Sequence, residues 1–257
     1  KLTGPEFDKV IYALFVKILK LQHWPNQFYC SSLKSVFKKG RKELMSNYRG
    51  ITLSPTIGKW WTLVLYGALQ SLASERGWMG RTQSGFTPGC QTGENVLVLR
   101  TLLHRAKRKG EPLKAAFIDL KKAYDIVDRK ILWNKLGRIG CAGIVLETIK
   151  SMYAKDCLTI NVNGEGSDSI RITRGVKQGC ILSPLLFNIF IADLGQSLDA
   201  VGGLPMGNTT VSSLLFADDL MLLGKTDEEV YKKIRIVQDW CKKNGMEVNF
   251  QKTKILD

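Results

Sequence analysis

Two adjacent carboxylates, Asp218 and Asp219, lie in the segment SSLLFADDLMLLG (residues 212–224), whose other residues are mostly apolar. This composition predicts β-structure. An ionised carboxylate that is buried without a partner destabilises a fold by several kcal/mol. No Lys or Arg stands between Thr210 and Gly224. The compensating positive charge must therefore come from distant segments of the chain or from a bound cation.

A third carboxylate, Asp119, ends another apolar run of strand length, LKAAFIDL (residues 113–120). Alternation along a strand places Phe117 and Asp119 on one face, and Ile118 and Leu120 on the other. If the two apolar segments are neighbours in one sheet, the three carboxylates converge. Such a cluster can hold two Mg²⁺ ions about 3.5–4 Å apart, one activating an attacking oxygen and one the leaving phosphate. A turn or strand-end role for each aspartate is the alternative.

The overall charge predicts a polyanionic partner. The 257 residues include 38 Lys and Arg against 23 Asp and Glu, a formal net charge of +15, which is typical of nucleic-acid-binding chains; a merely soluble basic protein is the alternative. The six cysteines are too far apart for a zinc knuckle or a disulfide framework, so we expect reduced packing residues. No uncharged run is long enough for a membrane helix, and we expect no membrane contact.

The elements that would position these carboxylates follow from periodicity. The first 110 residues are predicted to be mostly helical and strongly basic, with the apolar-periodic stretch IYALFVKILKL. Their Lys and Arg clusters at 38–42 and 105–109 are either phosphate contacts or solvated faces. The segment 121–140 is predicted to be a helix ended by glycine, and 226–245 a helix with a capping box from Thr226 and Glu229.

The remaining segments predict strands. LTINV and SIRIT, residues 158–162 and 169–173, alternate around turn residues and predict a hairpin. MEVNF (246–250) is predicted to be a further strand, and 212–224 a hairpin or strand pair that bends near the two aspartates. The order of elements favours an α+β fold with helices packed on one face of an antiparallel sheet.

Six ordered blocks resemble the reverse transcriptases of non-LTR (LINE-type) retrotransposons. Two blocks match the boxes that carry the catalytic aspartates of that family, one matches the box between them, and three match its flanking motifs. The amino-acid sequence that follows Gln178 favours LINE-type polymerases over intron maturases. The blocks are NYRGITL (47–53), QSGFTPGCQTGENVLVL (83–99), AFIDLKKAYD (116–125), RGVKQGCILSPLLFNIFI (174–191), FADD (216–219) and NFQKTKIL (249–256).

The resemblance implies a right-hand polymerase fold, with an antiparallel palm sheet backed by helices and a mostly helical fingers subdomain. Residues 1–112 would be mainly fingers, 113–126 palm, 127–177 a connecting segment with a hairpin, and 178–257 palm. We expect a fragment of a retrotransposon polyprotein, with the thumb, endonuclease and cysteine-rich tail absent from these residues. The implied partners are an RNA template, a DNA primer and dNTPs, inside the cell in nucleus and cytoplasm.

By the same resemblance, Asp119, Asp218 and Asp219 would bind two Mg²⁺ ions, with Mn²⁺ as a substitute. The backbone carbonyl of Leu120 would be an additional ligand. Tyr124 would crowd the 2′-hydroxyl of an incoming nucleotide, so that deoxynucleotides are favoured. On spacing alone, an aromatic that packs a helix is the rival interpretation of Tyr124.

The remaining implied site residues would bind the nucleotide. Gln178 and Gly179 would line its pocket, where a glycine permits close backbone approach. Arg49 corresponds to an arginine that grips the triphosphate, and Lys42 would assist it. Lys252 would help to protonate the leaving pyrophosphate, or it is a surface lysine.

Two positions depart from the family pattern: Gly50 stands where proline is usual, and Tyr124 where phenylalanine is usual. Neither change removes a catalytic group. We therefore predict an RNA-directed DNA polymerase that adds deoxynucleotides to a primer 3′-hydroxyl. The main alternative is a decayed or domesticated remnant that binds nucleic acid without polymerising. A metal-dependent phosphohydrolase and a polymerase that prefers ribonucleotides are further alternatives.

Overall fold

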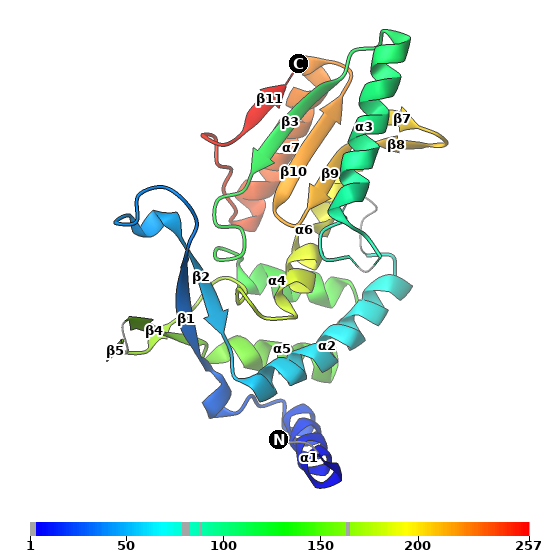
Figure 1. Cartoon of the computed structure of the whole chain (residues 1–257). Helices are drawn as coiled ribbons and strands as arrows, with labels where there is room; N and C mark the ends of the chain where they lie inside the picture. Colours follow the sequence, from blue (N-terminus) through cyan, green and yellow to red (C-terminus); the bar gives the residue numbers. More distant parts are fainter. Residues whose placement is uncertain (1–3, 79–82, 88, 163–164, 257) are drawn as a thin grey trace.

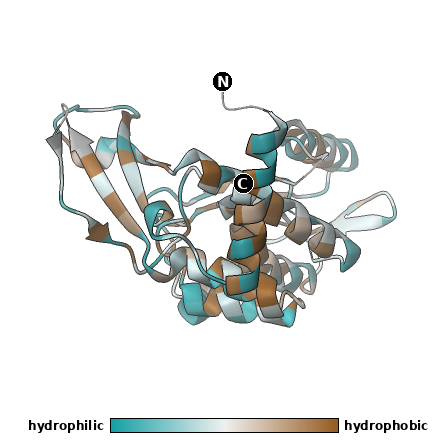
Figure 2. Cartoon of the chain, turned by 90° about the horizontal axis from the view of Figure 1, so that it is seen from below, coloured by the Kyte–Doolittle hydropathy of each residue, from teal (hydrophilic) through white to brown (hydrophobic). Residues whose placement is uncertain are grey.

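The computed structural model describes residues 4–78, 83–87, 89–162 and 165–256, which form an α+β structure with two main sheets (Figure 1). Figure 2 shows hydrophobic residues interleaved with polar ones on the strands and helices, as expected for elements that each bury one face. No helix among the described residues is long and apolar enough to cross a membrane. All six cysteines are free thiols in the structure, and three of them, Cys141, Cys180 and Cys241, are buried.

A four-stranded antiparallel sheet contains both aspartate segments. Its alternation matches the prediction, because Ala116, Ile118 and Leu120 are buried in the main core while Phe117 lies on the opposite face. The register pairs Asp219 directly with Asp119. In spatial order the strands are β11 (Lys254–Leu256), β3 (Lys114–Asp119), β10 (Asp219–Gly224) and β9 (Ser213–Phe216).

Three helices pack against this sheet (Figure 1). α6 (Ser183–Asp199), which begins with a proline in its first turn, and α7 (Asp227–Asn244) bury the core face. α3 (Thr92–Lys109) packs against the other face through a small apolar cluster that includes Leu102. The predicted limits of α7 are confirmed, since the Thr226 side chain accepts from the Glu229 N–H and the left-handed residue Gly245 ends the helix.

A second sheet has five strands, and the predicted hairpin within it is confirmed by the pairing of Leu158 with Ile170. The first two residues of the predicted turn, 163–164, lie outside the described residues. Two of the strands lie in the N-terminal region, where helices predominate as predicted but where the sequence pattern indicated no strand. The strands are β1 (Cys30–Phe37), β2 (Tyr48–Leu53), β4 (Cys157–Val162), β5 (Glu165–Gly166) and β6 (Ile170–Arg171).

Most of the remaining elements lie in the lower part of the molecule, on the side of the second sheet, and β7 and β8 lie beside the four-stranded sheet (Figure 1). The short hairpin β7–β8 follows α6. One 3₁₀ turn precedes β1, and a second lies in the connection between β1 and β2. These elements are α1 (Pro5–Leu21), α2 (Thr56–Glu75), α4 (Arg129–Arg138), α5 (Gly143–Ala154), β7 (Leu204–Met206), β8 (Thr209–Val211), η1 (Asn26–Phe28) and η2 (Met45–Asn47).

Two predicted elements are wrong in part. Residues 121–128 form turns rather than helix, because the Tyr124 and Val127 carbonyls accept from the backbone of a distant loop, and the helix begins only after the N-cap Asp128. Residues 246–250 make a single bridge, between Val248 and Leu120, instead of a strand. The strand predicted there forms further on, as β11.

Candidate active site

The aspartate pair lies at a tight hairpin turn. Phe216, at the end of β9, pairs with Asp219, at the start of β10, so Ala217 and Asp218 are the two central residues of the turn. This confirms the predicted bend near the aspartates. Because the chain reverses there, Asp218 and Asp219 are not forced onto opposite faces as adjacent residues of a straight strand would be.

The third carboxylate lies directly across the sheet from this turn. Asp119 and Asp219 are opposite each other in antiparallel strands, which places their side chains on the same face. Burial raises the pKa of Asp218, and the negative charges of Asp219 and Asp119 raise it further, while the Arg49 guanidinium lowers it. The fold therefore brings three carboxylates from two distant segments within electrostatic range, and it opposes them with an arginine from the other sheet.

Asp119 also has cationic and polar partners near the C-terminal end of the chain. The Asn249 Nδ2 donates to Asp119 Oδ2 at 2.9 Å, and the Lys252 Nζ lies 3.6 Å from the same oxygen. The structure thus places Lys252 beside an aspartate, although its side chain is 67% exposed. Asn249 was not among the predicted site residues. Its signal in the sequence is its position as the first residue of the family block NFQKTKIL (249–256).

The donor atoms suit a hard divalent cation, since they are carboxylate oxygens. Leu120 forms a β-bridge with Val248, in which the Asp119 carbonyl accepts from the Asn249 N–H and the Lys121 N–H donates to the Glu247 carbonyl. Successive carbonyls of a strand point in opposite directions, so the Leu120 carbonyl faces the β10 side. No group of three His, Cys, Asp or Glu side chains in the described part of the chain is close enough to hold a metal ion. Convergence of the carboxylates on one ion therefore requires rotation of side chains such as that of Asp119, which is 31% exposed.

Two of the aspartates open onto a cleft of about 500 Å³ between the sheet and α3. Its lining combines the charged side chains of Asp119, Asp219 and Lys252 with apolar ones such as Phe117 and Met221. A cleft with charged and apolar lining can hold an organic ligand and place its polar groups against the carboxylates.

Tyr124 lies close to the turn. Its ring stacks on Phe187 of α6, with 4.7 Å between the ring centroids, and its hydroxyl is buried without a hydrogen-bond partner. Burial raises the pKa of this hydroxyl, and the charge of Asp218 raises it further. The ring therefore packs against a core helix and also lies within electrostatic range of Asp218, which accommodates both interpretations of this residue.

Gln178 and Gly179 lie against β2, the strand that carries Arg49. The Gln178 carbonyl accepts from the Thr52 N–H at 2.9 Å, and its side chain donates to Asp125 at 2.6 Å. Gly179 has φ +99°, and a Cβ there would lie 2.7 Å from the Thr52 carbonyl oxygen. Only glycine fits this conformation and this approach without strain.

The two predicted fingers cations differ in their surroundings. Arg49 is exposed on β2, and its charge reaches Asp218. The Lys42 Nζ lies 5.9 Å from the centroid of the Phe37 ring, and the Lys42 carbonyl accepts from the Tyr48 hydroxyl. The structure therefore connects Arg49, but not Lys42, to the aspartates.

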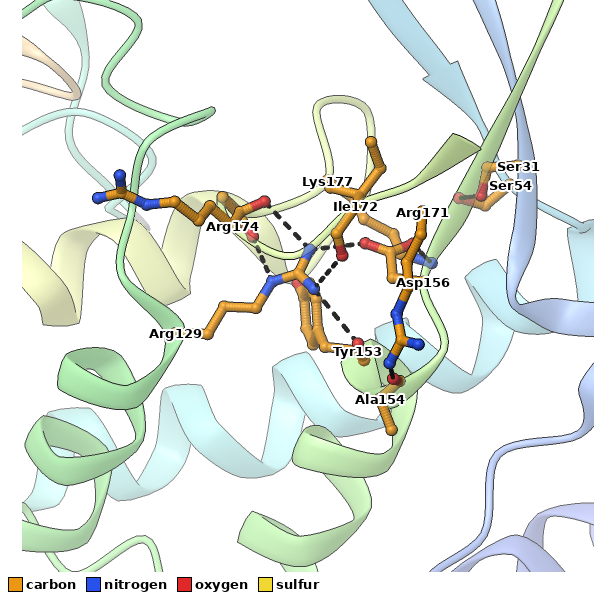
Figure 3. A network of polar contacts seen from close by, with 11 residues as sticks. Ser31, Ser54, Arg129, Tyr153, Ala154, Asp156, Arg171, Ile172, Arg174 and Lys177 are labelled. Carbon is orange, nitrogen blue, oxygen red and sulfur yellow. Dashed lines mark hydrogen bonds and ion pairs between the residues drawn. The ribbon is translucent and has the colours of Figure 1, made fainter. Parts of the chain in front are cut away.

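A buried polar network anchors the loop that leads into Gln178 (Figure 3). The Arg129 side chain, 9% exposed, pairs with Asp156 at 2.7 Å, and Lys177 pairs with the other oxygen of Asp156 at 2.9 Å. The Arg129 guanidinium also stacks over the Tyr153 ring. The carbonyl groups that accept from Arg129 are those of Tyr153, Ile172, Arg174 and Gly175. One side chain thus fixes much of the backbone that precedes the glutamine.

The sequence of the chain is similar to those of known proteins. The model of the family described as reverse transcriptase (RNA-dependent DNA polymerase) matches residues 36–257. The chain is similar to the "Retrovirus-related Pol polyprotein from type-1 retrotransposable element R2" of Popillia japonica, with 29% identity over 93% of this chain and 34% of that protein. It is also similar to the "Probable RNA-directed DNA polymerase from transposon BS" of Drosophila melanogaster, with 27% identity over 93% of this chain and 27% of that protein.

Solved structures with the same fold include telomerases. The apo telomerase of Candida tropicalis superimposes with a TM-score of 0.64 at 14% identity, over 99% of this chain and 50% of that one. The telomerase of Candida albicans, in complex with a telomeric RNA fragment, gives 0.63 at 14% identity, over 98% and 46%. The predicted polymerase fold is confirmed by these likenesses. The chain spans about a third or less of the length of the two retrotransposon and transposon proteins described above.

Proposed function

The chain belongs to the reverse transcriptase family, and on that premise we propose that it is the fingers and palm of a non-LTR retrotransposon polymerase. Residues 113–126 and 178–257 are the palm; 1–112 are mainly fingers, joined through 127–177. The reaction is attack of a primer 3′-hydroxyl on the α-phosphate of a dNTP, directed by an RNA template, with pyrophosphate as the leaving group.

One observation carries the proposal: Asp119 and Asp219 are opposite each other, and Asp218 lies on the adjoining turn. These carboxylates, with the Leu120 carbonyl, would hold divalent metal, Mg²⁺ as a pair of ions or Mn²⁺ in its place. Bound there, the metal supplies activation of the hydroxyl and neutralisation of charge on the leaving group. The rigid sheet then limits the movement of the aspartates during the reaction.

The residues around the aspartates bind and orient the nucleotide in this proposal. Arg49, whose planar guanidinium can grip two phosphate oxygens, binds the triphosphate from β2. Gln178 and Gly179 line the base and sugar side, where the absent Cβ allows close approach. Tyr124 blocks a 2′-hydroxyl. Lys252 donates a proton to pyrophosphate from its position beside Asp119.

The surface charge supports the partners of the proposal. A net charge of +15 suits two nucleic-acid backbones, an RNA template and a DNA primer, and binding through phosphate contacts falls steeply as salt rises. The thumb and endonuclease would belong to the parent polyprotein. In the relatives, about two thirds or more of the length lies outside the region that this chain matches.

Primer extension on an RNA template tests the proposal. The wild type, Asp218→Asn and a matched control, Asp239→Asn on the exposed face of α7, are compared with dNTPs and Mg²⁺ at low salt. We expect incorporation by the wild type and the control, and loss by at least about 100-fold in Asp218→Asn because a metal ligand is removed.

The other outcomes identify the rival functions. Tight RNA binding without incorporation by the wild type would indicate a binding remnant and overturn the proposal. Cleavage of the nucleic acid without dNTPs would indicate a phosphohydrolase. Faster incorporation of rNTPs than of dNTPs would indicate a polymerase with the opposite sugar preference.

A further inference from the structure

We propose that Gln83 is a positioning residue that holds the aspartate turn in its working conformation and thereby sets the affinity of the site for divalent metal. The inference rests on the proposed function of Asp218 as a metal ligand. Gln83 belongs to the segment 83–85, which is remote in sequence from the turn and contributes no group to the site itself.

The turn needs external support because of its backbone. Ala217 has φ +56°, in the left-handed region that glycine and asparagine adopt readily. A residue with a Cβ is disfavoured there by about 1–2 kcal/mol. The favoured two-residue hairpin turns require a positive φ at their first central position. An alanine at this position therefore has to be held by its surroundings, and Ala217 is 7% exposed.

The Gln83 side chain supplies that support. Its Oε1 accepts from the Ala217 N–H at 2.9 Å, and its Nε2 donates to the Ala217 carbonyl at 3.2 Å. One side-chain amide thus pairs with both backbone groups of the same residue, as a neighbouring strand would. Because Asp218 follows directly, these bonds fix the direction from which its carboxylate leaves the backbone.

Gln83 is itself held on several sides. Its Oε1 also accepts from the Gly85 N–H at 2.8 Å, and Gln83 forms a β-bridge with Leu215 of β9. The Asn188 side chain, 1% exposed on α6, donates to the Gly85 carbonyl at 2.7 Å. A Cβ on Gly85 would lie 2.2 Å from the Ala217 nitrogen. The glutamine is therefore a fixed support rather than a mobile side chain.

The expected consequence is a change in metal affinity without loss of the fold. Groups that orient metal ligands typically change affinity by 10- to 100-fold when removed. Gln83→Met keeps the length and apolar volume of the side chain but removes its two hydrogen bonds to Ala217 and the one from the Gly85 N–H. Gln83→Asn keeps the amide but is one methylene too short to reach both groups of Ala217. Both variants should bind metal about tenfold more weakly than the wild type.

Mn²⁺ binding to the free protein, followed by the loss of the electron paramagnetic resonance signal of free Mn²⁺, tests this directly. Asp218→Asn identifies the part of the binding that belongs to the site. Gln196→Met, a glutamine exposed on α6, is the matched control and should bind as the wild type does. Circular dichroism establishes that each variant is folded.

Wild-type affinity in both Gln83 variants would overturn the inference, and so would Mn²⁺ binding that Asp218→Asn leaves intact. Primer extension by the same proteins separates this inference from the proposed function. Weakened Mn²⁺ binding in both variants, with a wild type that does not extend primers, would overturn the polymerase proposal and keep the role of Gln83. If both hold, kcat at subsaturating Mg²⁺ should fall about tenfold while KM for the dNTP stays unchanged.

Discussion

Replacing Asp218 by Asn should make the metal-free protein more stable at neutral pH. In the folded state burial raises the pKa of Asp218, and the charges of Asp219 and Asp119 raise it further. A carboxyl group with a raised pKa favours folding below its unfolded pKa and loses that advantage as pH rises through the folded value. At pH 7 the ionised side chain is therefore destabilising. Asn keeps the shape of the side chain and removes the charge.

The size of the effect follows from the neighbours. Like charges placed opposite each other in a sheet destabilise it by about 0.2–1 kcal/mol. Asp218, on the adjoining turn, has two like-charged neighbours, Asp219 and Asp119, and the Arg49 guanidinium opposes them. We therefore expect Asp218→Asn to raise the free energy of unfolding by about 1 kcal/mol at pH 7. This corresponds to an increase of about 2–4 °C in Tm for a chain of this size.

Thermal unfolding followed by circular dichroism, at low salt with a chelator, measures this gain from pH 7 downwards. The two melting temperatures should converge as the pH approaches about 4, where a free aspartate becomes protonated. Mg²⁺ should stabilise the wild type more than the variant, because only the wild type retains the full ligand set. Asp239→Asn is the control. A variant that melts below the wild type at pH 7, or a gain that is equal at both ends of the pH range, would refute the electrostatic reasoning.

Three further predictions concern the pocket and its supports. Tyr124→Phe should leave the free energy of unfolding unchanged or raise it by up to about 1 kcal/mol, because the hydroxyl has no partner, whereas Tyr124→Ala should narrow dNTP-over-rNTP selection in single-nucleotide incorporation. Gly179→Ala should lower the free energy of unfolding, measured by urea denaturation, by about 1–2 kcal/mol, because Gly179 has φ +99° and lies close to the Thr52 carbonyl. It should also raise KM for the dNTP. Arg129→Met should lower the free energy of unfolding, measured by urea denaturation, by about 3–5 kcal/mol, because the buried Asp156 carboxylate loses its arginine partner. As a control, Arg138→Met at an exposed position of the same helix should change this free energy by under about 0.5 kcal/mol.

Local sequence determined several elements. The alternation along residues 113–120 assigns Phe117 and Ile118 to opposite faces, and the structure follows it. The limits of α7 follow from Thr226 and Gly245, because caps act on the nearest turn of backbone. The six ordered blocks identified the family, and the family match over residues 36–257 agrees.

Elements whose backbone is paired at long range were beyond local reasoning. Residues 121–128 have a helical pattern. The chain forms turns there instead, because the Tyr124 carbonyl accepts a hydrogen bond from the Val176 N–H and the Val127 carbonyl accepts one from the Gly175 N–H. The β1 and β2 strands were also missed. Part of their pairing is long-range, because β1 lies parallel to β4, more than 100 residues away in the sequence, whereas β1 and β2 pair with each other as a hairpin.

The sequence by itself determined which residue types could do chemistry: three aspartates on two strand-like segments, in a strongly basic chain. Only the tertiary structure decided how they meet, with Asp219 opposite Asp119 and Asp218 on the turn, directly after the positive-φ residue Ala217. It also decided which side chains support them: Gln83 accepts a hydrogen bond from the Ala217 N–H of the turn, and Asn249 donates one to Asp119. The physical reason is that periodicity and capping act over one or two turns of chain, whereas strand register and side-chain bonds to distant backbone arise only when the whole core packs.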